Sequence, residues 1–247
     1  MEQFKNYLLN KYKSDFMHNL IETSPIFNNE NIQIYQKLKN HEFDLNGIEG
    51  RLIEGRIGEI KFGENLFFGK VFKYMGDHSL YELTTDDFNF NYTSIDFKSD
   101  FGIDVDIKLL GPTTIRTEKF ASGRNHRECL FDTKDINKYL NMSERPFLLM
   151  YSDKPYYDDC HTIFVDLRLA YEKRNIIDSI YEIKLYTKNK SVYRINVEYD
   201  SQDNQRYHFL LNDKEFAKIV SSQYKAKHGM FKNCLCNVYA KAAGYST

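Results

Sequence analysis

Three charged side chains occupy alternate positions in one aliphatic segment near the middle of the chain. The segment runs from Phe101 to Leu110 and carries Asp104, Asp106 and Lys108 between isoleucine, valine and leucine residues. Because successive side chains of a β-strand point to opposite faces, a strand here has one aliphatic face and one face of acid, acid and base. A strand buried on both sides keeps such charges only when they pair with each other or hold a metal.

A further acid, Asp96, precedes this segment, and the stretch 99–102 between them has the composition of a tight turn. Such a turn would form a hairpin in which Asp96 and Asp106 face each other, with Lys108 on the same face and Glu59 approaching from a preceding helix. Carboxylate oxygens suit Mg²⁺, which polarises a phosphoryl oxygen and lowers the pKa of a bound water. An adjacent ammonium group orients that water and stabilises charge that develops on the phosphate. The set therefore predicts hydrolysis of a phosphodiester.

These residues also resemble a known motif. Ile95-Asp96, a spacer of nine residues and Asp106-Ile107-Lys108 resemble the PD-(D/E)XK motif of nucleases, with Ile95 in place of the motif's proline. The resemblance covers about residues 48–151 and is greatest to type II restriction endonucleases. It includes a helix that ends near Tyr139 and a buried strand at Phe147, which are similar to the helix and strand that follow the motif in the common core.

The resemblance implies a restriction-endonuclease-like core, which is an α/β fold with a mixed central β-sheet flanked by helices. It implies a hydrolase of the type II site-specific deoxyribonuclease class, with Mg²⁺ as cofactor and double-stranded DNA as substrate. Asp96, Asp106, Lys108 and Glu59 would form the catalytic group. Asp106 would be one metal ligand, and the other is left open between Asp96 and Asp104, because Asp104 shares its strand face with Asp106.

A polar and basic stretch follows the central strand, from Gly111 to about Arg127. We expect it to be a flexible loop that reaches phosphates or base edges in a DNA groove. The residues expected to contact DNA are Thr114, Arg116, Lys119, Arg124, Asn125 and Arg127.

The remaining elements follow from the periodicity of the apolar positions. Helical spacing over about 48–68 places Ile53, Ile57 and Ile60 on one stripe, and glycines within it indicate close approach to a sheet. Further helices are expected at 4–24, 32–38, 132–140, 213–221 and 230–243. Strands are expected at 70–74, 80–84, 88–97, 103–110, 147–151, 161–167, 182–186, 193–198 and 207–211.

Composition sets outer limits on the function. The chain has 247 residues, is 42% hydrophobic and has a net charge of −1, which indicates an ordinary globular protein without a global basic field. We expect a single domain over 1–247, with a nuclease core at about 48–151 and terminal elaborations for DNA recognition or dimerisation. No apolar run is long enough to cross a bilayer, so a cytoplasmic protein without a membrane partner is expected.

Two alternatives keep part of this interpretation. A structure-selective repair or recombination nuclease would use the same fold and residues on branched DNA. A non-catalytic nucleic-acid-binding module would instead carry the acidic face on an exposed edge strand with cross-strand ion pairs. For a restriction enzyme with a palindromic site, a homodimer is expected, because protein symmetry then mirrors DNA symmetry.

Overall fold

The structure is a computed structural model of the 247-residue chain. It describes residues 2–28, 47–65, 68–76, 79–81, 95–110, 115–119, 125–156, 159–172, 183–188, 190–198 and 210–229. The helices expected at 32–38 and 230–243, and most of the strand positions expected at 80–84 and 88–97, lie outside these residues.

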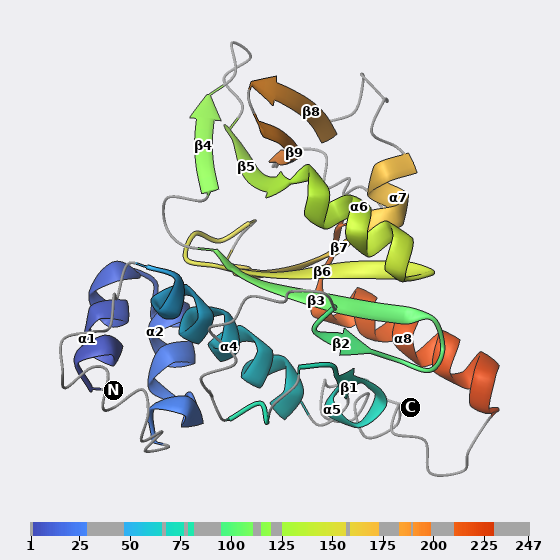
Figure 1. The fold of residues 1–247 in the computed structure, drawn as a ribbon, viewed down its shortest axis with the longest axis horizontal. Helices are drawn as coiled ribbons and strands as arrows, with labels where there is room; N and C mark the ends of the chain where they lie inside the picture. The colour runs from blue at the N-terminus through green and yellow to red at the C-terminus, as the bar shows by residue number, and fades with distance from the viewer. Residues whose placement is uncertain are drawn as a thin grey trace.

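The described part contains helices and strands in mixed order (Figure 1). The helices are α1 (Glu2–Lys11), α2 (Asp15–Glu22), the short 3₁₀ helix η1 (Pro25–Phe27), α4 (Ile48–Glu64), α5 (Phe68–Val71), α6 (Thr133–Met142), α7 (Leu167–Glu172) and α8 (Asp213–His228). The strands are β1 (Lys73–Tyr74), β2 (Phe97–Lys98), β3 (Ile103–Leu110), β4 (Ile115–Lys119), β5 (Asn125–Asp132), β6 (Arg145–Ser152), β7 (Thr162–Asp166), β8 (Ile183–Lys188), β9 (Lys190–Glu198) and β10 (Leu210–Leu211).

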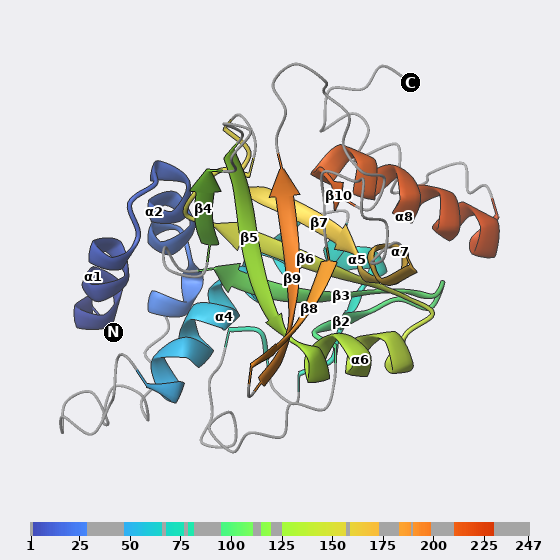
Figure 2. The ribbon, with the colours of Figure 1, turned by 90° about the horizontal axis from the view of Figure 1, so that it is seen from above.

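The strands form two sheets. Within the described residues, the larger sheet has six strands in the order β1-β2-β3-β6-β7-β10, and β3 and β6 are the only parallel neighbours among them. The smaller is antiparallel, with the order β4-β5-β9-β8. In Figure 2, the strands of the smaller sheet cross over those of the larger one. The larger sheet is mixed and carries helices, so the expected α/β class with a mixed central sheet is confirmed.

Helices cover both faces of the larger sheet (Figure 1). On one face, Ile103, Val105 and Ile107 of β3 belong to a buried cluster with α1, α2, α4 and α8. On the other face, Leu148 and Met150 of β6 pack with α6 and α7. The central strand β6 is buried on both faces, as its uninterrupted apolar run predicts.

Two expected helices end earlier than the apolar pattern suggests. The segment expected at 4–24 is broken before α2, because the Ser14 side chain accepts a hydrogen bond from the Met17 N–H at 3.2 Å and begins a new helix there. The helix expected at 48–68 ends at Glu64, because Asn65 is extended and its side chain accepts the Phe68 N–H at 3.2 Å. The strand expected at 70–74 is therefore reduced to β1, since α5 occupies its beginning.

Helix α4 approaches the sheet closely at one glycine. A Cβ atom on Gly58 would lie 3.1 Å from Ile107 Cγ2 and 3.3 Å from Tyr151 Cδ2, in β3 and β6. A Cβ atom on Gly55 would meet only Glu59 Oε1, at 3.8 Å. The expectation that glycines allow this helix to approach a sheet is confirmed at Gly58.

We therefore expect opposite effects from two alanine substitutions in α4. Gly55→Ala should raise the free energy of unfolding by up to about 1 kcal/mol, because alanine favours the helix. Gly58→Ala should lower the free energy of unfolding by about 1 to 2 kcal/mol, because the cost of overpacking against two strands exceeds the gain in helix propensity. Urea unfolding of both variants measures the difference, and equal stabilisation by both would show that α4 does not contact the sheet at Gly58.

Candidate active site at the β2–β3 hairpin

The turn expected at 99–102 joins β2 to β3. The Ser99 hydroxyl donates to the Ile103 carbonyl at 2.5 Å, and the Ser99 N–H donates to the same carbonyl at 3.2 Å. Gly102 has a φ of +84°, a conformation that favours glycine. The expected tight turn is therefore confirmed, and it fixes the register in which Lys98 is paired with Asp104 and Phe97 with Val105.

Asp96 lies where β2 separates from β3. Continuing the register by two residues would place Ile95 opposite Ile107, but the ladder ends at the Phe97–Val105 pair. The Ile107 N–H instead donates to Asp96 Oδ2 at 2.7 Å. The carboxylate thus replaces a backbone acceptor, and this contact holds Asp96 beside the middle of β3.

Asp106 and Lys108 form an ion pair on the opposite face from the aliphatic residues of β3. Lys108 Nζ lies 2.8 Å from Asp106 Oδ2, and the Tyr139 hydroxyl of α6 donates to the same oxygen at 2.8 Å. Lys108 Nζ also lies 5.9 Å from the centroid of the Tyr139 ring. Asp106 is only 3% exposed, and β3 lies inside the sheet. Strand β3 is therefore not the exposed edge strand that the non-catalytic alternative expects for this acidic face.

The charges on Asp96, Asp106 and Lys108 influence one another. Burial raises the pKa of Asp96 well above its usual value, and the carboxylates of Asp106 and Glu59 raise it further. Burial by itself lowers the pKa of Lys108, but Asp106, Tyr139 and Asp96 outweigh that effect and raise this pKa well above its usual value. The lysine therefore carries its charge at neutral pH, while Asp96 is a carboxylate that is costly to ionise without a further cation.

Glu59 is held at the edge of this group by two other side chains. Arg56 Nη1 and the Tyr74 hydroxyl each donate to Glu59 Oε2 at 2.8 Å, and the Arg56 guanidinium lies 5.3 Å from the centroid of the Tyr74 ring. The carboxylate of Glu59 contributes to the raised pKa of Asp96, after burial and Asp106. Within the described residues, however, no three His, Cys, Asp or Glu side chains are arranged to hold a metal ion.

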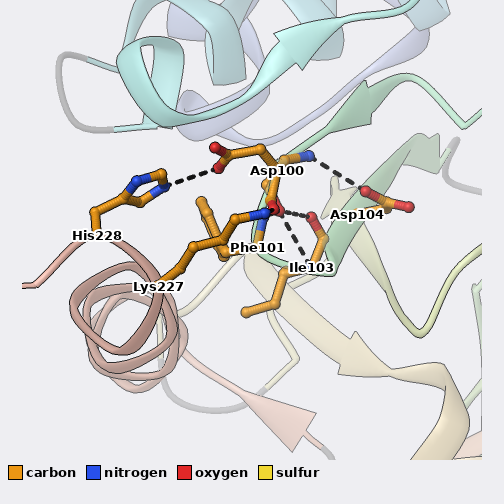
Figure 3. A network of polar contacts seen from close by, with 7 residues as sticks. Asp100, Phe101, Ile103, Asp104, Lys227 and His228 are labelled. Carbon is orange, nitrogen blue, oxygen red and sulfur yellow. Dashed lines mark hydrogen bonds and ion pairs between the residues drawn. The ribbon is translucent and has the colours of Figure 1, made fainter.

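Asp104 lies on the same strand face as Asp106, but its carboxylate is hydrogen-bonded to the turn. Its Oδ1 accepts the Ser99 N–H at 3.2 Å, and Figure 3 shows the carboxylate directed at the turn. Burial raises the pKa of Asp104, against the lowering effect of its hydrogen bonds and of Lys98. On the outer side of the same turn, His228 Nε2 lies 3.0 Å from Asp100 Oδ1, so the end of α8 holds the hairpin (Figure 3). The geometry thus places Asp96, rather than Asp104, beside Asp106 and Lys108.

Four of the six predicted DNA contacts lie in a hairpin of the smaller sheet. Thr114 and Arg124 are outside the described residues. The other four residues are in strands, Arg116 and Lys119 in β4 and Asn125 and Arg127 in β5.

The expectation of a flexible loop over about 111–127 is therefore wrong for 115–119 and 125–127, which are in strands, and the rest of that stretch lies outside the described residues. Lys119 is the register partner of Asn125, and Arg127 is the partner of Thr117. Strand β5 forms its second set of backbone hydrogen bonds with β9. A strand that is stabilised by so distant a partner has no signal in its own polar sequence that would predict it.

Two residues of this site, Tyr74 and Tyr139, were expected only as parts of a strand and a helix. For Glu59, the sequence offers an ion pair with Arg56 or Lys61 as the alternative to a role in catalysis, and the structure forms the pair with Arg56. The i, i+3 spacing of Arg56 and Glu59 is a usable signal for an ion pair. The two tyrosines give no such signal, because their hydroxyls reach the carboxylates only through helix–sheet and strand–helix packing.

Removing the Tyr139 hydroxyl tests the geometry around Asp106. We expect Tyr139→Phe to lower the free energy of unfolding by about 1.5 to 3 kcal/mol, because a buried carboxylate loses a donor. Chemical denaturation followed by circular dichroism measures this change. Tyr224→Phe, in a partly buried ring of α8, is the matched control and should cost less. Equal effects of the two substitutions would contradict the Tyr139–Asp106 contact.

No protein-family model matches the chain, and neither the curated proteins nor the solved structures provide a match. Among the described helices, none combines the length and apolar character needed to cross a membrane.

Proposed function

We propose that the chain is a Mg²⁺-dependent endonuclease that cleaves double-stranded DNA at specific sites, as a type II restriction enzyme with a PD-(D/E)XK core. The observation that carries this proposal is the meeting of Asp96 with the Asp106–Lys108 pair at the point where β2 leaves β3. The order of elements supports it: helix α4, the β2–β3 hairpin, helix α6 and the buried strand β6 parallel to β3.

The oxygen atoms around this point fit a hard divalent cation. Asp106 makes both of its described polar contacts through Oδ2, and Asp96 accepts the Ile107 N–H through its own Oδ2. Within the described part of the chain, the Oδ1 atoms of these two residues therefore remain for a cation. Two carboxylates suffice for Mg²⁺, which usually keeps several waters and binds substrate phosphate as well. A cation here would also offset the repulsion that raises the pKa of Asp96.

Each side chain then has a defined role. When bound, Mg²⁺ would polarise the phosphate and lower the pKa of a water. Asp96 and Asp106 would hold the ion, and Tyr139 and Lys108 fix the orientation of Asp106. Lys108 remains protonated because of its raised pKa, so it would stabilise negative charge on the phosphate and orient the attacking water rather than accept its proton. Glu59 would act through its charge on Asp96, since its own oxygen is held by Arg56 and Tyr74.

The partners follow from the same proposal. Double-stranded DNA is the substrate, and the hairpin β4–β5 supplies the predicted contacts at Arg116, Lys119, Asn125 and Arg127. A homodimer would match a palindromic site by two-fold symmetry. These assignments rest on the basic composition of the segment and on its position directly before α6, which carries Tyr139.

A substrate screen tests the proposal. The purified protein is incubated with plasmid DNA of mixed sequence and Mg²⁺, and with branched DNA as a second substrate. Discrete fragments from linear or plasmid duplex would support a site-specific enzyme. Preferential cleavage of the branched DNA would favour the structure-selective alternative. Binding without cleavage of any DNA, with Mg²⁺ or Mn²⁺, would favour a non-catalytic module and overturn the proposal.

A further inference from the structure

Two lysines are direct partners across the edge of the larger sheet. Lys73 of β1 is paired with Lys98 of β2, and Lys98 is paired with Asp104 of β3. Residues paired in this way share a face, so both lysines lie on the face that carries Asp106 and Lys108. The next residues confirm the assignment, because the rings of Tyr74 and Phe97 pack together on the opposite, apolar face at 5.3 Å.

This pairing is unfavourable for the isolated protein. Like charges directly opposite each other in an antiparallel pair are destabilising. Neither Lys73 nor Lys98 makes an ion pair within the described residues; Lys73 is exposed and Lys98 is partly buried. Asp104 lies opposite Lys98, and Lys98 lowers the pKa of this carboxyl group. One carboxylate offsets at most one of the two positive charges, and Asp104 also accepts the Ser99 N–H. A lysine on an edge strand can prevent aggregation, but that role needs Lys73 alone and does not explain a second lysine opposite it.

The position of the pair suggests what compensates the charge. Lys98 is two residues from Asp96 along the chain, and its partner Asp104 is two residues from Asp106. Two residues of a strand span roughly 7 Å, which is comparable with the separation of neighbouring phosphates along one nucleic-acid strand. A strand of DNA with one phosphate at Asp96 and Asp106 can therefore present the adjacent phosphate to the two lysines.

We propose that Lys73 and Lys98 bind the phosphate next to the scissile one and so set the path of the cleaved strand across the hairpin. This inference rests on the proposed function, since it takes the position of Asp96 and Asp106 as the point of cleavage. The lysines act as positioning residues: they hold the DNA strand, and the chemistry remains with Asp96, Asp106 and Lys108. Arginine at both positions should keep much of the binding, because the contact is to charge.

The salt dependence of DNA binding tests this inference separately from cleavage. Binding of a labelled duplex of random sequence is measured without divalent metal, over about 50 to 200 mM salt, for the full chain. Each neutralised phosphate contributes about 0.9 to the slope of log affinity against log salt, and the two lysines share one phosphate, so the Lys73→Ala/Lys98→Ala variant should have a slope shallower by about 0.9. Lys5→Ala/Lys61→Ala, in α1 and α4 on the other face, is the control and should keep the wild-type slope.

The possible results separate the two proposals. A wild-type slope in the Lys73→Ala/Lys98→Ala variant would overturn the phosphate contact even if the protein cleaves DNA. A shallower slope together with no cleavage activity would support the phosphate contact and count against the proposed endonuclease. Absence of duplex binding by the wild-type protein at the lowest salt would overturn the phosphate contact directly. Recovery of the slope by Lys73→Arg/Lys98→Arg would show that charge, rather than folding, explains the loss.

Discussion

Lys108→Ala is expected to reduce DNA cleavage by about 10²- to 10³-fold or more, the usual effect of removing one group that stabilises transition-state charge. Lys108 Nζ is bonded to Asp106 Oδ2 at 2.8 Å, and its raised pKa keeps it charged. Cleavage rates measured at saturating Mg²⁺ give the effect on chemistry. Duplex binding without metal should change little, because one charge is a small part of a DNA interface.

Lys61→Ala is the matched control, because Lys61 is an exposed lysine of α4. It should cleave at the wild-type rate. Circular dichroism of Lys108→Ala is needed beside the rates, since Asp106 loses its cation in this variant and the free energy of unfolding should fall. Lys108→Arg keeps the charge with a different geometry and should retain an intermediate rate. A folded Lys108→Ala protein with the full cleavage rate would exclude Lys108 from the chemistry.

Asp96→Asn is expected to abolish Mg²⁺-dependent cleavage and at the same time to stabilise the metal-free protein. Asparagine keeps an oxygen for the Ile107 N–H, which Asp96 accepts at 2.7 Å, so the hydrogen bond that holds this residue is retained. The charge that burial, Asp106 and Glu59 make unfavourable is removed. Thermal unfolding without metal should show a gain of roughly 0.5 to 2 kcal/mol, as for other stabilising substitutions at strained functional sites.

The effect of pH on this variant has a defined sign. The folded-state pKa of Asp96 is raised above the value of 3.8 that applies to the unfolded chain, so the folded protein binds this proton more tightly. The stability of the wild-type protein therefore falls as pH rises from that value through the raised pKa. Asp96→Asn lacks this loss, so the two proteins should be equally stable at the acid end and differ most at higher pH.

Added Mg²⁺ should stabilise the wild-type protein at neutral pH and leave the stability of Asp96→Asn unchanged. With Mg²⁺, the wild-type protein should therefore be the more stable of the two. The matched control is Asp100→Asn, in the exposed turn next to the same hairpin, which should keep the response to Mg²⁺. An Asp96→Asn protein that is less stable than wild type at every pH would show that the carboxylate is structural. Equal stabilisation of both proteins by Mg²⁺ would place the ion elsewhere.

Much of the fold near the site could be predicted because the signals there are local. The alternation of apolar residues in β3, the turn composition at 99–102 and the uninterrupted apolar run of β6 each determine an element without reference to distant residues. The C-terminal end of α4 and the hairpin β4–β5 could not be predicted in the same way. The first depends on the side chain of Asn65, and the second depends on pairing with β9, more than sixty residues later along the chain.

The residues of the site likewise separate into those fixed by local sequence and those fixed by long-range contacts. Asp106 and Lys108 lie two residues apart on one strand, so their proximity follows from the strand itself. The position of Asp96 opposite Asp106 also follows from the turn. The hydrogen bond from the Ile107 N–H to Asp96 could not be predicted, because it forms only where β2 separates from β3. The separation of Asp104 from the pair required the contact with Ser99. The tyrosine hydroxyls on Asp106 and Glu59 required the packing of whole elements.

One paired measurement tests the central claim most directly. Wild-type protein and Asp106→Asn, purified in parallel and shown to be folded by circular dichroism, are each incubated with duplex DNA that contains many sequences, with Mg²⁺ and with a chelator in its place. We expect cleavage only by the wild-type protein with Mg²⁺, because Asp106 links Lys108, Tyr139 and the proposed ion. Cleavage by Asp106→Asn at the wild-type rate, or by the wild-type protein in chelator, would contradict a metal-dependent active site at the β2–β3 hairpin.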